Sequence, residues 1–171
     1  AGLIWQMLDW LRIRTGYNRA VRVPNTNELF TYQQIGQWFG RADPCWGSEP
    51  AYSLEQCART GVTAAQYGNI LQSPVNDYYN VKWGGTPDLD PEEADTVTFG
   101  LVFDATDTMR ISFDYWDIKI EGLISDIQPQ VVMDQCANYS QLCSRINRAV
   151  NGSLWISQEG FVDVTNLNLG G

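Results

Sequence analysis

The sequence predicts an all-β fold, in which antiparallel up-and-down strands form part of a transmembrane β-barrel and long loops carry short helices. Four stretches alternate apolar and polar residues, as strands with two unlike faces do. The connections between them run long, short, long, and two far exceed the usual hairpin loop of about 2–5 residues. A soluble β-sandwich seldom has a connection between two strands as long as residues 23–93. Transmembrane barrels, in contrast, combine short turns on one side with long loops on the other.

The first strand is expected at residues 8–22, and its two faces differ in polarity. The apolar face holds Leu11, Ile13, Thr15 and Tyr17. The polar face holds Arg12, Arg14, Gly16 and Asn18. Unpaired buried charge is expensive, so arginines on a strand face suit a wet barrel lumen better than the core of a small sandwich.

The second strand is expected at residues 94–104, directly after an acidic, proline-containing loop. Pro87 and Pro91 stop strand pairing above the membrane, because proline has no N–H to donate to a ladder. The lipid-facing side chains are then Val97, Phe99, Leu101 and Phe103. Thr96, Thr98 and Gly100 face the lumen.

Two further strands are expected, at residues 109–121 and 160–170, the first of them after a tight polar turn at 104–109. The alternation in 109–121 shifts parity after Tyr115, which predicts a β-bulge near Trp116–Asp117. Aromatic residues toward the strand ends suggest the girdles of a membrane barrel. They are Trp5, Trp10, Tyr17, Tyr115 and Trp116.

The long loops are expected to contain short helices, inside 53–71 and 128–147. Ser53 can cap a helix that Gly61 ends, Thr63 can cap a second one, and Pro129 suits a first helical turn. The four cysteines fall into two local pairs without zinc-site spacing. We therefore expect the disulfides Cys45–Cys57 and Cys136–Cys143 and an oxidising compartment.

Composition argues against several classes of function. A net charge of −9 disfavours nucleic-acid binding, which depends on Lys and Arg. The chain contains no histidine, the most common general base and metal ligand, and no nucleophile motif, so neither an enzyme nor a cofactor is expected. The chain does not begin with Met, and we interpret it as a piece of a longer protein.

Three segments, taken in order, resemble TonB-dependent outer-membrane receptors. They are "NRAVRVPNTNELF" (18–30), "GGTPDLDPEEADTVTFGLVF" (84–103) and "ISFDYWDIKIEGLI" (111–124). "DPC…CARTG" is similar to a cysteine-bearing loop of some members, whereas Asp90 stands where the family usually has Lys. The resemblance implies that residues 1–171 are part of a single barrel domain of the bacterial outer membrane, whose plug domain and remaining strands are absent.

The resemblance also implies partners and a function. The partners would be the lipid bilayer and, through absent parts of the parent chain, the TonB energy-coupling complex. The parent would take up a ferric siderophore, cobalamin or a sugar. Candidate residues for contact with ligand or plug lie where the first strand meets its loop; the alternative, which we favour, is that they fold this loop inward by hydrogen bonding. They are Arg19, Arg22, Asn25, Asn27 and Glu28.

Other residue groups have a functional and a plainer interpretation. A calcium site at Asp88, Asp90 and Glu92 competes with a solvated acidic turn, which we favour because the EF-hand pattern is missing. A catalytic carboxylate pair, Asp114–Asp117 or Glu92–Glu93, is disfavoured against lumen and loop charges. An aromatic ligand platform competes with loop packing, which we favour, for Trp38, Phe39, Trp46 and Trp83.

The competing fold is a soluble secreted β-sandwich that binds carbohydrate. Tryptophans, disulfides and acidic charge all permit it. The two folds differ in the outer strand face, because lipid-facing side chains are apolar and yet exposed in the isolated chain, whereas a sandwich buries them against a second sheet.

Overall fold

A computed structural model describes residues 1–74, 77–106 and 108–170 and divides the chain into two compact units. The first, here called the strand unit, comprises Ala1–Pro24, Leu89–Ile124 and Asn168–Gly171. The second, here called the loop unit, comprises Asn25–Asp88 and Ser125–Leu167. Each unit draws on segments far apart in the sequence.

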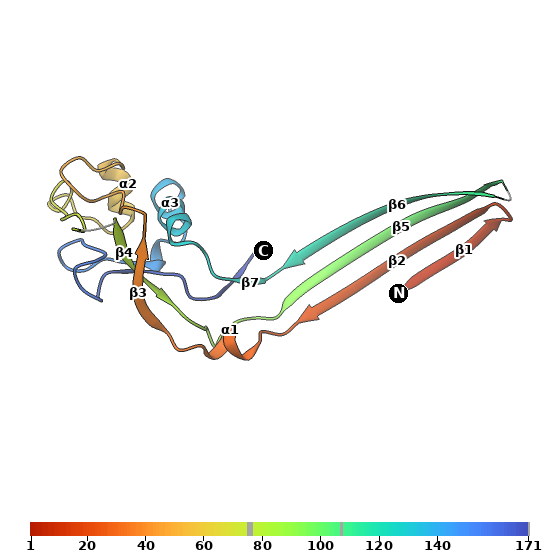
Figure 1. Ribbon diagram of the computed structural model, residues 1–171, viewed down its shortest axis with the longest axis horizontal. Coiled ribbons are helices and arrows are strands. Elements are labelled where there is room, and N and C mark those ends of the chain that lie inside the picture. Colours follow the sequence, from red (N-terminus) through yellow and green to blue (C-terminus); the bar gives the residue numbers. More distant parts are fainter. Residues whose placement is uncertain (75–76, 107, 171) are drawn as a thin grey trace. The chain divides into compact units, whose positions relative to one another are not determined.

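The strand unit contains a four-stranded sheet in the order β1-β2-β5-β6, with every neighbouring pair antiparallel (Figure 1). Its strands are β1 (Gly2–Leu8), β2 (Leu11–Arg22), β5 (Glu92–Thr106) and β6 (Met109–Glu121). The short strands β7 (Leu123–Ser125) and β10 (Leu167–Leu169) form a separate two-stranded sheet. The up-and-down antiparallel order expected from the alternating stretches is thus confirmed.

Both faces of this four-stranded sheet are largely exposed, including the apolar one. Phe99 is 45% exposed and Phe113 is 64% exposed, although both belong to the apolar face. A β-sandwich would bury these side chains against a second sheet. The exposure therefore has the character expected of a lipid-facing wall and disfavours the sandwich alternative.

The first predicted strand is wrong at its N-terminal end. Residues 8–22 do not form one strand, because the chain reverses at Asp9–Trp10 between β1 and β2. The Gln6 side-chain amide donates to the carbonyl oxygens of Leu8 and Asp9, which stabilises the turn. Gly2–Leu8 form a separate strand, which the alternating pattern did not predict.

The expected bulge near Trp116–Asp117 is also wrong. Pairing of β5 with β6 is continuous from Glu93↔Glu121 to Asp104↔Arg110, and the irregularity lies next to the hairpin, between Asp104 and Thr106. The continuous pairing places Asp117 and Lys119 on the face of Tyr115, and Ile118 and Ile120 on the face of Asp114. Trp116 consequently lies on the opposite face from Tyr115, away from an outer girdle.

The strand expected at residues 160–170 is likewise wrong, because two short strands replace it. β9 (Phe161–Asp163) pairs in parallel with β4 (Tyr78–Trp83), and β10 pairs with β7. Between β9 and β10, one carboxylate oxygen of Asp163 accepts from the Thr165 backbone N–H at 2.9 Å and from its hydroxyl at 2.7 Å. Such local side-chain hydrogen bonds compete with a sheet ladder and end the strand.

The loop unit has its own sheet, in the order β3-β4-β9-β8, which the sequence did not predict. β3 (Gln34–Phe39) is antiparallel to β4, and β8 (Ile146–Asn147) is antiparallel to β9. The parallel pair β4–β9 departs from the wholly antiparallel order that was expected. The sheet packs on a helix through a core of Tyr79, Val81, Val132, Met133, Leu154, Val162 and Val164.

The helices are α1 (Thr26–Phe30), α2 (Leu54–Arg59) and α3 (Pro129–Tyr139), with a 3-10 turn at Cys143–Arg145. Ser53 caps α2, and Gly61 follows it with φ +95°, as expected. The helix expected from Thr63 is wrong: the Thr63 carbonyl accepts from the Gln66 and Tyr67 N–H groups in turns only. Among the described residues, no helix is long and apolar enough to cross a membrane.

Both expected disulfides are present. Cys45–Cys57 has a Cα–Cα distance of 5.7 Å, and Cys136–Cys143 has one of 4.8 Å. The first bridge lies in a second core with Trp46, Val62 and Ile70. Nearby, the Tyr52 hydroxyl donates to Asp134 of α3, and burial together with this hydrogen bond raises the pKa of Tyr52.

Loss of the Cys45–Cys57 bridge is expected to destabilise the loop unit by about 2–4 kcal/mol, because the bridge restricts the unfolded loop. The double replacement Cys45→Ala/Cys57→Ala tests this in the intact receptor, with protease cleavage of the loop unit in urea as the measurement. The Cys136–Cys143 bridge closes a shorter loop, so its removal in Cys136→Ala/Cys143→Ala should destabilise the loop unit by an amount at the lower end of this range. Equal cleavage of wild type and both variants would contradict the prediction.

A buried ion pair holds two distant parts of the loop unit together. Arg148 and Asp43 have side chains only 3% and 2% exposed, and both guanidinium Nη atoms contact the carboxylate, at 2.6 and 3.0 Å. Arg148 also donates to the carbonyl of Gly152 and to Thr60, and Asp43 accepts from the Cys45 N–H. Every polar group of the pair thus has partners, as a buried charge requires.

Candidate functional site

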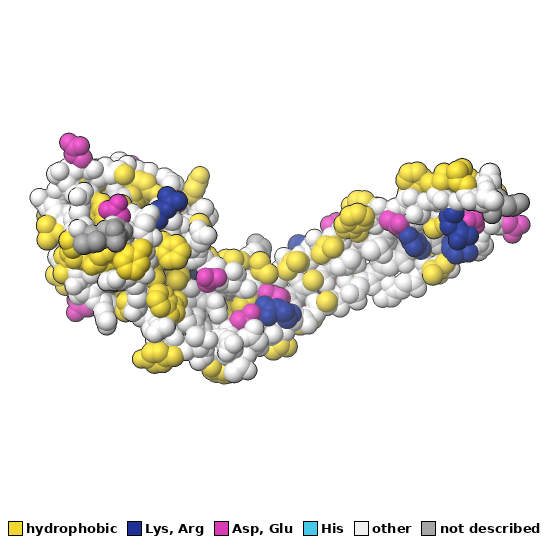
Figure 2. Space-filling model, viewed as in Figure 1, with side chains coloured by type: hydrophobic (Ala, Val, Ile, Leu, Met, Phe, Trp, Pro, Cys, Tyr) yellow, Lys and Arg dark blue, Asp and Glu magenta, His cyan; other side chains and the backbone are white. Residues whose placement is uncertain are grey.

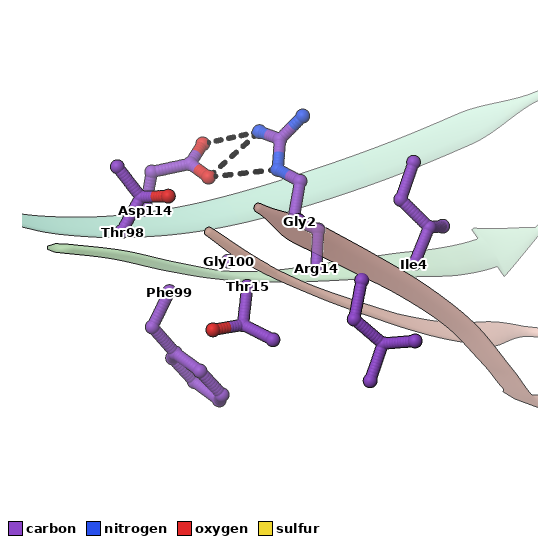
Figure 3. Close-up of a pocket in the computed structure, with 9 residues that line it drawn as sticks. Gly2, Ile4, Arg14, Thr15, Thr98, Phe99, Gly100 and Asp114 are labelled. Atoms are coloured by element: carbon purple, nitrogen blue, oxygen red, sulfur yellow. Dashed lines mark hydrogen bonds and ion pairs between the residues drawn. The ribbon is translucent and has the colours of Figure 1, made fainter. Parts of the chain in front are cut away.

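The strand unit has one apolar and one polar face, and the strand register assigns each residue to one of them. Directly opposed residues of neighbouring antiparallel strands share a face. One row across the sheet is Thr15↔Phe99↔Tyr115, and the adjacent row is Arg14↔Gly100↔Asp114. Figure 3 shows the side chains of Thr15 and Phe99 on one side of the strands and those of Arg14 and Asp114 on the other.

An ion pair on the polar face spans three strands. Arg14 of β2 reaches over β5 to Asp114 of β6, with its Nε 3.0 Å and its Nη2 2.7 Å from the same carboxylate oxygen (Figure 3). Gly100 lies beneath the pair: a Cβ there would be 2.4 Å from Asp114 Oδ1 and 2.6 Å from Arg14 Nε. Only a residue without a side chain leaves room for this bridge.

Replacing Gly100 by valine is therefore expected to break the Arg14–Asp114 bridge and destabilise the sheet by about 1–3 kcal/mol, the usual effect of overpacking. Thermal unfolding of the intact receptor measures this. Thr98→Val is the matched control, because Thr98 lies on the same face and already carries a branched side chain. A Gly100→Val receptor as stable as the control would contradict the assigned role of Gly100.

Other charges of the polar face are also paired. Arg12 donates to Gln6 at 2.8 Å, Arg110 pairs with Asp104, and Arg22 pairs with Glu92, whose Oε1 is 2.7 Å from Nη2. In Figure 2, basic and acidic side chains adjoin one another at several places along the strand unit. Exposed pairs of this kind add little stability, so they indicate a wet, ordered polar surface.

The structure places the candidates Arg19 and Arg22 on opposite faces of β2. Arg22 shares the polar face with Arg14, whereas Arg19 shares the face of Tyr17 and pairs with Glu93 of β5. The two arginines therefore do not form one contact surface. Their carboxylate partners were not recognised in the sequence, because the 23–91 connection separates them.

The candidates Asn25, Asn27 and Glu28 lie together at the start of α1 and fold the chain there. Asn25 Oδ1 accepts from the N–H groups of Asn27 and Glu28, at 2.9 and 3.0 Å, and Glu28 Oε2 accepts from the Asn25 N–H at 2.7 Å. This reciprocal arrangement is a capping box. The three residues also line a pocket of about 290 Å³ beside Trp83 and Asp126.

The two carboxylate pairs considered as catalytic candidates do not point toward a common site. Asp114 and Asp117 lie on opposite faces of β6, as do Glu92 and Glu93 on β5. The Glu92 carboxylate already accepts hydrogen bonds from the Arg22 guanidinium and from the Ile124 N–H, which lies 2.7 Å from Oε1. Within residues 1–74, 77–106 and 108–170, no group of three or more His, Cys, Asp or Glu side chains is arranged to hold a metal ion.

The four aromatic residues considered for a ligand-binding platform do not form one surface. Trp46 is buried beside the first disulfide, while Trp38, Phe39 and Trp83 remain exposed in part. The structure instead joins Phe39 to Tyr78, with ring centroids 5.7 Å apart, and Tyr78 to Trp155 at 5.9 Å. Trp155 was missed because its approach depends on the β3–β4 pairing and on a loop far away in the sequence.

The chain is similar in sequence and structure to one group of proteins. Residues 1–159 match the family model "TonB dependent receptor-like, beta-barrel". A mutant form of the ferric enterobactin receptor of Pseudomonas aeruginosa matches with TM-score 0.53 and 13% identity, over 99% of this chain and 17% of that one. The siderophore receptor of Acinetobacter baumannii matches with TM-score 0.50 and 12% identity, over 99% and 18%.

At these identities the structural likeness establishes the fold alone. The chain spans less than a fifth of the length of either receptor. No curated protein matches the sequence.

Proposed function

The chain belongs to the TonB-dependent receptor family, within the β-barrel domain, and from this premise we propose that its parent is an outer-membrane receptor for energy-coupled uptake of a small ligand. Candidate ligands are a ferric siderophore, cobalamin or a sugar. The two similar structures are named as a ferric enterobactin receptor and a siderophore receptor, which supports uptake of a small ligand without selecting among the three. In this proposal the receptor transports its ligand and does not convert it chemically.

The observation that carries the proposal is the sheet with two unlike exposed faces. Its apolar face suits contact with acyl chains, and its ion-paired polar face suits a wet lumen. Long connections leave one end of β2, β5 and β6, and short turns join the other ends. This combination supports a barrel wall better than a soluble binding module.

The parts of the chain receive roles accordingly. Residues 1–171 form part of a single barrel domain, with the strand unit in the wall and the loop unit outside the cell. The bilayer contacts the apolar face, and the TonB complex acts through other parts of the parent. In this proposal Arg22, Asn25, Asn27 and Glu28 remain candidates for contact with ligand or plug, whereas Arg19 lies on the apolar face, away from the lumen, and pairs with Glu93.

Uptake measurements in cells test this proposal. Cells with and without the parent gene are given ferric enterobactin, cobalamin or oligosaccharides, each with and without an uncoupler of the proton gradient. Uptake of one ligand should require both the parent and the gradient. Uptake of all ligands independent of either, or recovery of the parent as a soluble secreted protein, would overturn the proposal.

A further inference from the structure

We propose that a groove on the loop unit binds a neutral, polyhydroxylated ligand, that is, a saccharide. This inference rests on the proposed function, because it names the ligand class of the same receptor. The groove runs along β3 and β4 against the segment that follows Leu154. Two adjoining pockets of about 450 and 440 Å³ form it and share Ile35 and Gln158.

Trp155 provides a fixed aromatic wall in this groove. Its indole N–H donates to the Leu71 carbonyl at 2.8 Å, and its ring meets that of Tyr78 edge to face. A tryptophan held in one orientation offers an apolar face at little further cost in conformational entropy. Pyranose rings present flat patches of C–H groups that pack on such faces.

The polar side chains of the groove are mainly uncharged amides and a hydroxyl. They are Gln33, Gln34, Gln37, Asn80, Ser157 and Gln158, and the hydroxyl of Tyr32 adds to them. Asn80 is held in place, because its Nδ2 donates to the carbonyls of Ser157 and Gly160, each at 2.9 Å. An amide both donates and accepts hydrogen bonds, which matches a hydroxyl group that also does both.

The charge of the groove disfavours an ionic ligand. Lys82 is the single charged side chain among the described residues that line it. Its ammonium lies 3.6 Å from the Asp163 carboxylate and 6.0 Å from the centroid of the Phe161 ring, so its charge is already compensated. An anionic iron chelate calls for uncompensated Arg or Lys.

The net charge of the whole loop unit also disfavours an anionic ligand. Residues 25–88 and 125–167 contain ten Asp and Glu but five Lys and Arg. Two of these cations are committed within the fold: Arg148 to Asp43, and Arg145 to the carbonyls of Asp163 and Thr165. The field around the groove therefore repels an anion and leaves a neutral ligand unaffected.

Binding to the purified full-length receptor tests the inference. The probes are neutral oligosaccharides of glucose, xylose and N-acetylglucosamine, with ferric enterobactin as the anionic comparison, followed by tryptophan fluorescence and calorimetry. One oligosaccharide should bind, and Trp155→Ala should weaken it about tenfold or more, as truncation of an aromatic anchor does. Tyr139→Ala is the matched control, because Tyr139 of α3 is 68% exposed and does not line the groove.

Gln37→Ala and Gln158→Ala provide a second test that does not risk the core, because both side chains are exposed. Each should weaken oligosaccharide binding while ferric enterobactin gives no signal. The inference is overturned if no oligosaccharide binds, or if these variants and Trp155→Ala bind as the wild type does. Gradient-dependent uptake of another ligand by the same receptor would then leave the proposed function intact.

Discussion

Replacing Arg148 by methionine is expected to destabilise the loop unit by about 3–5 kcal/mol, the usual result of removing one partner of a buried ion pair. The variant leaves the Asp43 carboxylate, 2% exposed, without its counter-charge. It also removes the donors that satisfy the carbonyls of Thr60 and Gly152. Methionine fills a similar volume, so the loss is mainly electrostatic.

The measurement is the urea dependence of protease cleavage in the loop unit of the intact receptor, which reports local unfolding when reclosing is fast. Arg41→Met is the matched control: the same chemical change at an exposed position should alter stability little. The double variant Arg148→Met/Asp43→Leu should be less destabilised than Arg148→Met alone, because no charge remains buried. Equal cleavage of Arg148→Met and Arg41→Met would refute the role of the pair.

The wall strands were predictable because their signal is local. In β5, the alternation from Val97 to Phe103 gives both the strand and the membership of each face, since side chains of a strand alternate with period two. Pro129 and Ser53 likewise marked helix starts through chemistry within one turn. The bulge prediction failed because Ile118 and Ile120 were assigned by polarity alone, whereas continuous backbone pairing determines their face.

The loop unit was less predictable because its structure depends on long-range contacts. Arg148 and Asp43 are 105 residues apart, and neither belongs to a sequence motif from which their ion pair could be predicted. β9 is a three-residue strand whose parallel pairing with β4 has no local signature. The groove at Trp155 follows from these same contacts, so the sequence supplied its aromatic and amide residues but not their assembly.

Arginine at position 99 or 101 is expected to destabilise the receptor barrel by about 2–4 kcal/mol if the site lies near the bilayer midplane. Phe99 and Leu101 lie on the apolar face, where Phe99 pairs with Thr15 and Tyr115 and Leu101 pairs with Ile13 and Phe113. A guanidinium there must sit among acyl chains or draw water inward. Urea unfolding of the receptor in lipid vesicles measures the loss of stability.

Thr98→Arg is the matched control, because Thr98 lies one position away on the opposite, polar face, in one row with Gly16 and Trp116. A charge there meets water and the ion pairs already present, so it should destabilise the barrel much less than Phe99→Arg. A protein core behind Phe99 would also penalise arginine. Stability alone therefore does not distinguish lipid from protein as the neighbour of this face.

Fluorophores on Phe99→Cys and Thr98→Cys make that distinction in reconstituted membranes. Labelling is selective within this chain, because all four of its native cysteines are in disulfides. A quencher dissolved in the lipid should reach the label at position 99, and a water-soluble quencher should reach the one at position 98. Protection of position 99 from both quenchers would mean that protein covers the apolar face, which would remove the observation on which the receptor-wall assignment rests.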